Sequence, residues 1–186
     1  MEDLRKRLVK AAEDGDVQKV ESTIAEARQK LPDKEPVTVV SRAIRFLVKS
    51  GIDVHMQDDK ALRWAAKAGD LELLQYLLDV GADVHAEDEE ALRDAAKEGH
   101  VEVVRCLIAH GADVHIMNEE PLSLAASWGN LEVVKYLIEE AGADPLARWG
   151  DAEHLAEYWG HRDVEAYLEE QMARARSIFS QQTEEV

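Results

Sequence analysis

The amino-acid sequence predicts a mainly α protein, a solenoid of stacked helix-turn-helix units with short finger turns and helical caps at both ends. Two observations carry this prediction: a segment that recurs every 30 residues, and apolar positions spaced as in helices. The 186 residues are rich in Ala, Leu, Glu and Lys but only 5% aromatic, which also favours helices over a sheet sandwich.

The first half of each unit is expected to be a short helix with two adjacent alanines. Leu62, Ala65 and Ala66 place apolar atoms on one helix face, and the alanines are small enough for a neighbouring helix to approach closely. A glycine follows, which can end the helix in a left-handed conformation at little cost. The corresponding segments are 61–70, 91–100 and 121–130.

The second half of each unit is an apolar helix, then a turn. In the first unit, Leu71, Leu73, Leu74, Leu77 and Leu78 form a face too broad for one helix pair to bury, so neighbouring units have to stack. The glycine of a Gly-Ala-Asp turn ends this helix, and we expect the side chain just ahead of the next helix to cap it. The turn glycines are Gly81, Gly111 and Gly142, and the expected caps are Asp58, Asp88 and Asn118.

The order Leu-x-x-Ala-Ala-x-x-Gly, an apolar helix with Leu-Leu or Val-Val, and Gly-Ala-Asp-Val resembles the ankyrin repeat family. Three consecutive units match, from about residue 52 to 144. Two departures are evident: the family's Thr-Pro-Leu-His start appears only as Ala-Leu-Arg at 61 and 91 and as Pro-Leu-Ser at 121, and the period is 30 rather than roughly 33 residues. The missing residues lie between Gly-Ala-Asp and the first helix, so the fingers should be shortened.

The two ends of the chain differ from its middle. We expect an N-terminal capping unit at residues 1–51, in which Leu8–Asp16 matches the first-helix pattern and an inserted helix runs from Val37 to Lys49. Three regular repeats at 52–144 precede a degenerate C-terminal capping repeat at 145–179 and a flexible tail at 180–186.

The formal charge of −17 argues against nucleic acid or an anionic membrane as a direct partner, because both reward Lys and Arg at the contact surface. A basic protein partner fits better, although the acidity could serve solubility alone. The chain lacks a signal peptide and a long apolar run, so we expect a cytoplasmic protein. We also expect it to be a monomer. Cys106, the single cysteine, is expected to be a small packed side chain.

Catalytic and metal sites are not predicted. His55, His85 and His115 recur at one phase of the repeat, where units about 10 Å apart cannot share a metal ion. His154, Glu157 and His161 do not form a zinc-hydrolase motif. The sequence also lacks a glycine-rich phosphate loop and a nucleophile elbow, so we expect no enzyme activity and no cofactor.

The resemblance implies that fingers and first helices line a concave, partner-binding face. Aromatic residues gather at its C-terminal end, where they either contact a partner or pack against the C-terminal cap with Trp149. The residues carried over by position are Trp64, Lys67, Asp94, Lys97, Glu98, Leu124, Ser127, Trp128, Tyr158 and Trp159.

Two functions follow as hypotheses. The first is a non-catalytic scaffold that recognises a protein through the concave face. The alternative is an acidic inhibitor or decoy that imitates nucleic acid and blocks a basic enzyme cleft.

Overall fold

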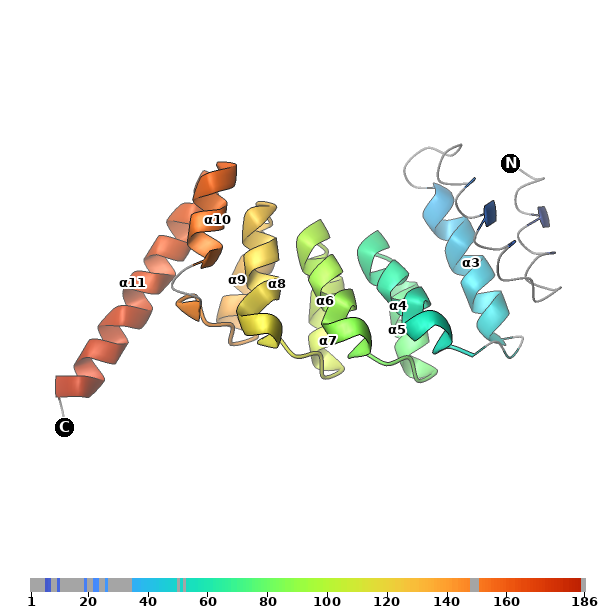
Figure 1. Cartoon of the computed structure of the whole chain (residues 1–186), viewed down its shortest axis with the longest axis horizontal. Coiled ribbons are helices and arrows are strands. Elements are labelled where there is room, and N and C mark those ends of the chain that lie inside the picture. Colours follow the sequence, from blue (N-terminus) through green and yellow to red (C-terminus); the bar gives the residue numbers. More distant parts are fainter. Residues whose placement is uncertain are drawn as a thin grey trace. The chain divides into compact units, whose positions relative to one another are not determined.

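The regular elements in the described part of the chain are all helices, as the sequence predicts (Figure 1). Backbone contacts divide the protein into two compact units, residues 1–83 and 84–186, and each unit is described by itself. The first helix expected at residues 8–16 lies outside the described residues, apart from Lys10. The computed structural model describes residues 6, 7, 10, 19, 22, 23, 26, 35–49, 51, 53–147 and 151–184.

The first unit contains the inserted helix that the sequence predicts from Val37 to Lys49. This helix, α3 (Glu35–Lys49), begins two residues earlier, and Pro36 stands in its first turn, where a missing N–H costs no hydrogen bond. Val40 and Ala43 on α3 are buried, and α3 contacts the two helices that follow it in the chain. Those helices are α4 (Met56–Ala68) and α5 (Leu71–Asp79).

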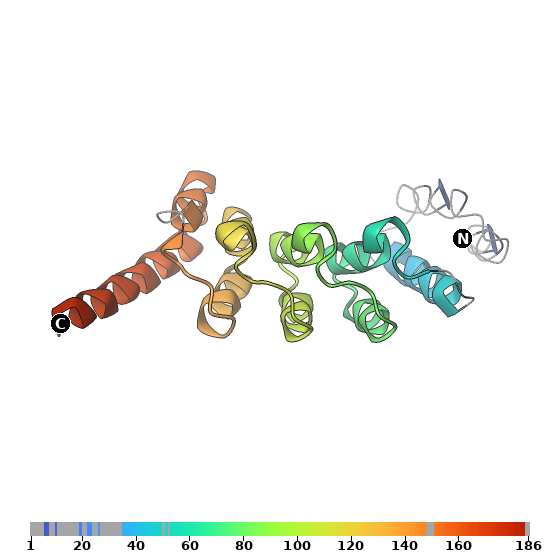
Figure 2. The ribbon, with the colours of Figure 1, turned by 60° about the horizontal axis from the view of Figure 1, so that its bottom comes forward.

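The second unit contains two regular helix pairs and a C-terminal pair. Its first helices, α6, α8 and α10, form one layer in which each contacts the next, and α7 and α9 form the other layer (Figure 2). The described helices of this unit are α6 (Ala86–Glu98), α7 (Val101–Ala109), α8 (Ile116–Ser127), α9 (Leu131–Glu139), α10 (Asp151–Trp159) and α11 (Arg162–Glu184).

Leucine, valine and paired alanine side chains form the core of each unit. Leu62, Ala65 and Ala66 are fully buried in the first unit, as the amphipathic pattern predicts. Burying a Leu or Val side chain contributes about 1.5–3 kcal/mol, so burial of these side chains is the largest favourable contribution to the stability of each unit. The most buried side chains of the second unit include Leu92, Ala95, Ala96, Val104, Leu107, Leu122, Ala125, Ala126, Val134, Leu137, Ala156, Val164 and Leu168.

The last helix, α11, is longer than the sequence pattern predicts. We expected the C-terminal capping repeat to end at residue 179, whereas α11 continues five residues further, to Glu184. The sequence after Gly160 contains no glycine or proline and is rich in Glu, Gln, Ala and Arg, so nothing in it stops the helix earlier.

Each regular repeat enters its first helix through three residues in left-handed conformation. In the second unit, Glu87, Asp88 and Glu89 have φ angles of 53°, 52° and 61°. The same conformation recurs at residues 57–59 and 117–119. Non-glycine residues adopt it at a cost of about 1–2 kcal/mol each, so contacts elsewhere in the repeat have to offset this strain. The shortened finger therefore turns by a backbone device that the sequence pattern did not reveal.

The prediction that Asp58, Asp88 and Asn118 cap the first helices is wrong. These residues lie within the left-handed turns, and their side chains make no hydrogen bond to the described part of the chain. The next residue takes over: Asp59 is buried, and its Oδ1 accepts the backbone N–H of Asp83 at 3.0 Å. This acid therefore joins two successive turns of the first unit.

We predict that Asp88→Val destabilises the protein, because a β-branched side chain is poorly tolerated at positive φ. The free energy of unfolding should fall by about 1–2 kcal/mol in urea titrations. The matched control is Asp88→Gly, which removes the same exposed side chain but accepts a positive φ. Equal losses in the two variants would contradict a left-handed turn at this position.

Candidate functional site

The predicted site residues fall in both units. Trp64 and Lys67 belong to α4 of the first unit, where Trp64 is half-buried and Lys67 is exposed. The other eight lie in the second unit at or near the C-terminal ends of its first helices. They are Asp94, Lys97 and Glu98 on α6, Leu124, Ser127 and Trp128 at the end of α8, and Tyr158 and Trp159 on α10.

Three exposed aromatic side chains stand out in the second unit, and we call them the aromatic cluster: Trp128, Tyr158 and Trp159. Their exposed fractions are 57%, 79% and 61%. Trp128 and Trp159 both precede the glycine that ends a first helix, and α8 and α10 are in contact. The three rings are therefore not packed inside the unit, and Trp149, with which they were expected to pack in the alternative, lies outside the described residues.

Two of these rings meet each other at a right angle. The ring centroids of Tyr158 and Trp159 are 5.2 Å apart, with an angle of 90° between the ring planes. Edge-to-face pairs of this kind are favoured by the ring quadrupole. Adjacent residues on α10 thus present two perpendicular aromatic surfaces to solvent.

Trp128 is covered by a cation from the preceding repeat. The ammonium nitrogen of Lys97 lies 4.8 Å from the centre of the Trp128 ring, within the range of a cation–π interaction. Ser127, one position earlier on α8, donates its hydroxyl proton to the carbonyl oxygen of Leu124 at 2.9 Å. The structure therefore joins Lys97 to Trp128, while Ser127 and Leu124 interact within their own helix.

The side chains that follow α8 and α10 bond to the end of the preceding first helix. The amide nitrogen of Asn130 donates to the carbonyl oxygens of Ala96 and Lys97 at 2.9 and 2.7 Å. His161 does the same one repeat later, with Nε2 at 3.1 Å from the carbonyl oxygen of Ser127. These bonds satisfy carbonyls that a helix end leaves unpaired. These bonds between repeats therefore fix the positions of the residues just before the helix-ending glycines.

The sequence pattern did not predict that the residue after the repeat glycine contacts the neighbouring repeat. The signal that could have revealed it is that this position is polar in successive repeats, with Asn130 and His161 in the second unit. An added Cβ at Gly129 would come within 2.5 Å of His161 Nδ1, so this glycine is also required by close approach.

We predict that Asn130→Asp lowers the free energy of unfolding by about 1–3 kcal/mol, measured by urea titration. The substitution keeps the shape but replaces a two-proton donor with an anionic acceptor that faces two carbonyl oxygens. The matched control is Asn118→Asp, since Asp58 and Asp88 occupy that phase in the other repeats. A loss no larger than that of the control would show that the Asn130 bonds do not support the stack.

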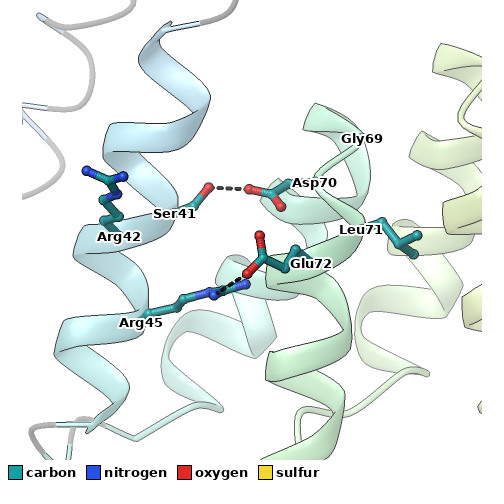
Figure 3. A pocket seen from close by; sticks show the side chains of 7 residues that line it. All are labelled: Ser41, Arg42, Arg45, Gly69, Asp70, Leu71 and Glu72. Carbon is teal, nitrogen blue, oxygen red and sulfur yellow. Dashed lines mark hydrogen bonds and ion pairs between the residues drawn. The ribbon is translucent and has the colours of Figure 1, made fainter.

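The first unit contains a cavity of about 430 Å³ between α3 and the start of α5 (Figure 3). Two polar contacts cross it: Ser41 donates a hydrogen bond to Asp70, and Arg45 Nη1 lies 2.8 Å from Glu72 Oε1. Asp70 also accepts the N–H of Leu73 at 3.0 Å and so caps α5. These contacts attach the inserted helix to the first repeat, and the sequence analysis did not anticipate them.

The recurring histidines form one ion pair in each repeat. His55 Nδ1 lies 3.2 Å from Asp59 Oδ2, and His115 Nδ1 lies 2.5 Å from Glu119 Oε1. The equivalent atoms of His85 and Glu89 are also 2.5 Å apart. Each imidazole is exposed while its carboxylate is buried. The hydrogen bond to the carboxylate raises the pKa of His55 and of His115 above the ordinary value.

The raised pKa of His115 predicts a pH-dependent contribution to stability. Protonated His115 stabilises the fold, so its contribution is complete below the unfolded-state pKa of about 6.5 and is lost as pH rises through the higher folded-state value. His115→Gln should therefore lower the thermal midpoint more at about pH 5.5 than at about pH 9. In a Glu119→Gln background, the same substitution should show no such pH dependence. A pH-independent effect in both backgrounds would exclude the charged pair.

Other candidate groups do not converge. His154 Nδ1 lies 3.6 Å from Glu153, while His161 contacts Ser127 after Gly160 has ended α10. Cys106 is half-buried. In the described part of the chain, no three His, Cys, Asp or Glu side chains are grouped so that they could hold a metal ion.

Stacked helix pairs with paired alanines, glycine-terminated helices and cross-repeat contacts define a helical repeat protein. The family model described as ankyrin repeats (3 copies) matches residues 39–118, 62–149 and 92–174. The chain belongs to the ankyrin repeat family.

A search among curated proteins found no match. Ankyrin repeats indicate a protein-interaction scaffold, and the family is generally non-catalytic. Among the described helices, none is both long and apolar enough to cross a membrane.

Proposed function

We propose that this protein is a non-catalytic scaffold that binds a protein partner through the concave, first-helix face of its repeats. The observation that carries the proposal is the exposure of the aromatic cluster at the ends of α8 and α10. Large aromatic side chains are frequent anchors of protein interfaces, and leaving three of them in water is unfavourable without a ligand.

The rigidity of the helix ends supports the same proposal. Asn130 bonds the end of α6, and His161 bonds the end of α8, to the following repeat, so this surface is ordered before a partner arrives. A pre-ordered surface loses little conformational entropy on binding, and more of the contact energy appears as affinity. The polar positions Asp94, Lys97 and Glu98 would then form the rim beside the aromatic anchors.

The alternative function is that of an acidic decoy for a basic enzyme cleft, and the charge of −17 favours it. Three acids at the turns are not available for this purpose, because Asp59, Glu89 and Glu119 are buried and paired with histidines. Exposed acids remain on the turns, including Glu87 and Asp88. We therefore favour the aromatic surface as the binding site.

Alanine substitution of the aromatic cluster tests the proposal. We expect Trp128→Ala and Trp159→Ala each to reduce capture of a partner from native cells by the immobilised full chain, by tenfold or more, as loss of an interface hot spot does. The control is Met117→Ala, which removes another exposed apolar side chain of the same unit, on a turn.

Two results would contradict the scaffold proposal. One is that the tryptophan variants capture the same proteins as the control variant does. The other is that capture falls steeply with salt but is indifferent to both tryptophans, which is the behaviour of an acidic decoy.

A further inference from the structure

Cations cover aromatic ring faces at several places in this protein. Besides Lys97 over Trp128, the guanidinium carbon of Arg105 lies 4.2 Å from the centre of the Tyr136 ring. In the first unit, the guanidinium carbon of Arg45 lies 5.6 Å from the centre of the Tyr76 ring. Each contact joins one repeat element to the next. The chain therefore uses cation–π contacts repeatedly.

The step from α6 to α8 is repeated from α8 to α10. Asn130 bonds to the carbonyl oxygen of Lys97, and His161 bonds to the carbonyl oxygen of Ser127. Lys97 and Ser127 both stand two residues before the glycine of their helix, and Trp128 and Trp159 both stand one residue before it. By position in the repeat, Ser127 therefore corresponds to Lys97, and Trp159 corresponds to Trp128.

Among the residues that the structure describes, the second of these steps lacks the cation that the first one has. Ser127 is too short to reach the next helix, and its hydroxyl bonds to Leu124 within α8. No Lys or Arg of the described residues lies over the Trp159 or Tyr158 ring. Trp159 thus has an exposed ring, and no described residue takes the place that Lys97 has over Trp128.

We propose that a lysine or arginine side chain of the partner protein fills this place and lies against Trp159, with Tyr158 as the second wall. The perpendicular arrangement of the two rings offers a corner for a cation. The net charge of −17 favours a cationic ligand, and exposed Glu157 belongs to the same helix, α10. This inference rests on the proposed function and identifies the chemistry of the partner segment.

The substitution Ser127→Lys tests the inference directly, because it supplies in cis the cation that Lys97 supplies to Trp128. The matched control is Ser177→Lys on α11. Ser177 is an exposed helical serine, and its hydroxyl likewise bonds to the carbonyl three residues earlier, that of Arg174, at 2.9 Å. The two variants add the same charge to the same protein, so general electrostatic effects cancel in the comparison.

The measurement is the indole N–H resonance of Trp159 in the full chain, assigned with Trp159→Ala and followed by NMR during titration with a hexalysine peptide. We expect a saturable shift that a hexaglutamine peptide does not produce. Ser127→Lys should weaken the apparent affinity by a factor of about two to five relative to Ser177→Lys, the size of an exposed cation–π contact. Circular dichroism of both variants verifies that the helices are retained.

Three outcomes would overturn the inference: an unshifted Trp159 resonance, equal affinities in the two lysine variants, or equal shifts with both peptides. The failure of the scaffold proposal looks different. If capture of the native partner still depends on Trp159 while hexalysine leaves its resonance unchanged, the binding surface stands and only the cationic anchor is excluded. If capture ignores both tryptophans, the surface itself is excluded.

Discussion

Close packing of the first helices is the contact on which the rest of the second unit depends. Ala95 and Ala96 on α6, and Ala125 and Ala126 on α8, are fully buried, and a methyl group is the largest side chain that lets such helices approach closely. At this separation, the side chain of Asn130 reaches the carbonyls at the end of the preceding helix. Larger side chains at the alanine positions would separate the helices and break these bonds, with a cost well beyond that of overpacking alone.

The shortened finger imposes a second constraint, because fewer residues have to make the same turn. Three consecutive left-handed residues achieve it in each regular repeat, at an intrinsic cost of several kcal/mol. Buried carboxylates such as Asp59 and Glu89 help to offset this strain, since each lies at the end of a left-handed turn and pairs with the histidine four residues earlier. In the first unit, the acid bonds to the following turn as well. The histidine and acid positions are therefore best explained by backbone strain rather than by chemistry on a ligand.

Sequence reasoning predicts the helices, the glycine-terminated ends and the inserted helix because these depend on local pattern and on steric rules. Sequence reasoning fails where two neighbouring side chains could fill the same role. Asp58 and Asp59 are adjacent acids, and propensity favours the first as a cap, whereas only the left-handed turn shows that the second is buried. Contacts between repeats, such as that of Lys97 with Trp128, depend on how neighbouring repeats are oriented. The 30-residue spacing predicts that the repeats stack, but it does not give this orientation. The exposure of Trp159 likewise depends on what packs nearby.

Comparison of equivalent positions separates what the repeats need for stability from what is left for a partner. Asn130 and His161 differ in chemistry but make the same bond to the preceding helix end, so the fold tolerates either. Lys97 and Ser127 are also equivalent, yet of the two only Lys97 makes a cation–π contact, with the ring of Trp128. Since a solenoid repeats its geometry, an interaction present in one step and missing in the next marks a place where the protein leaves a group unsatisfied. An exposed indole on a rigid helix end is such a group, and its energy becomes available when a partner covers it.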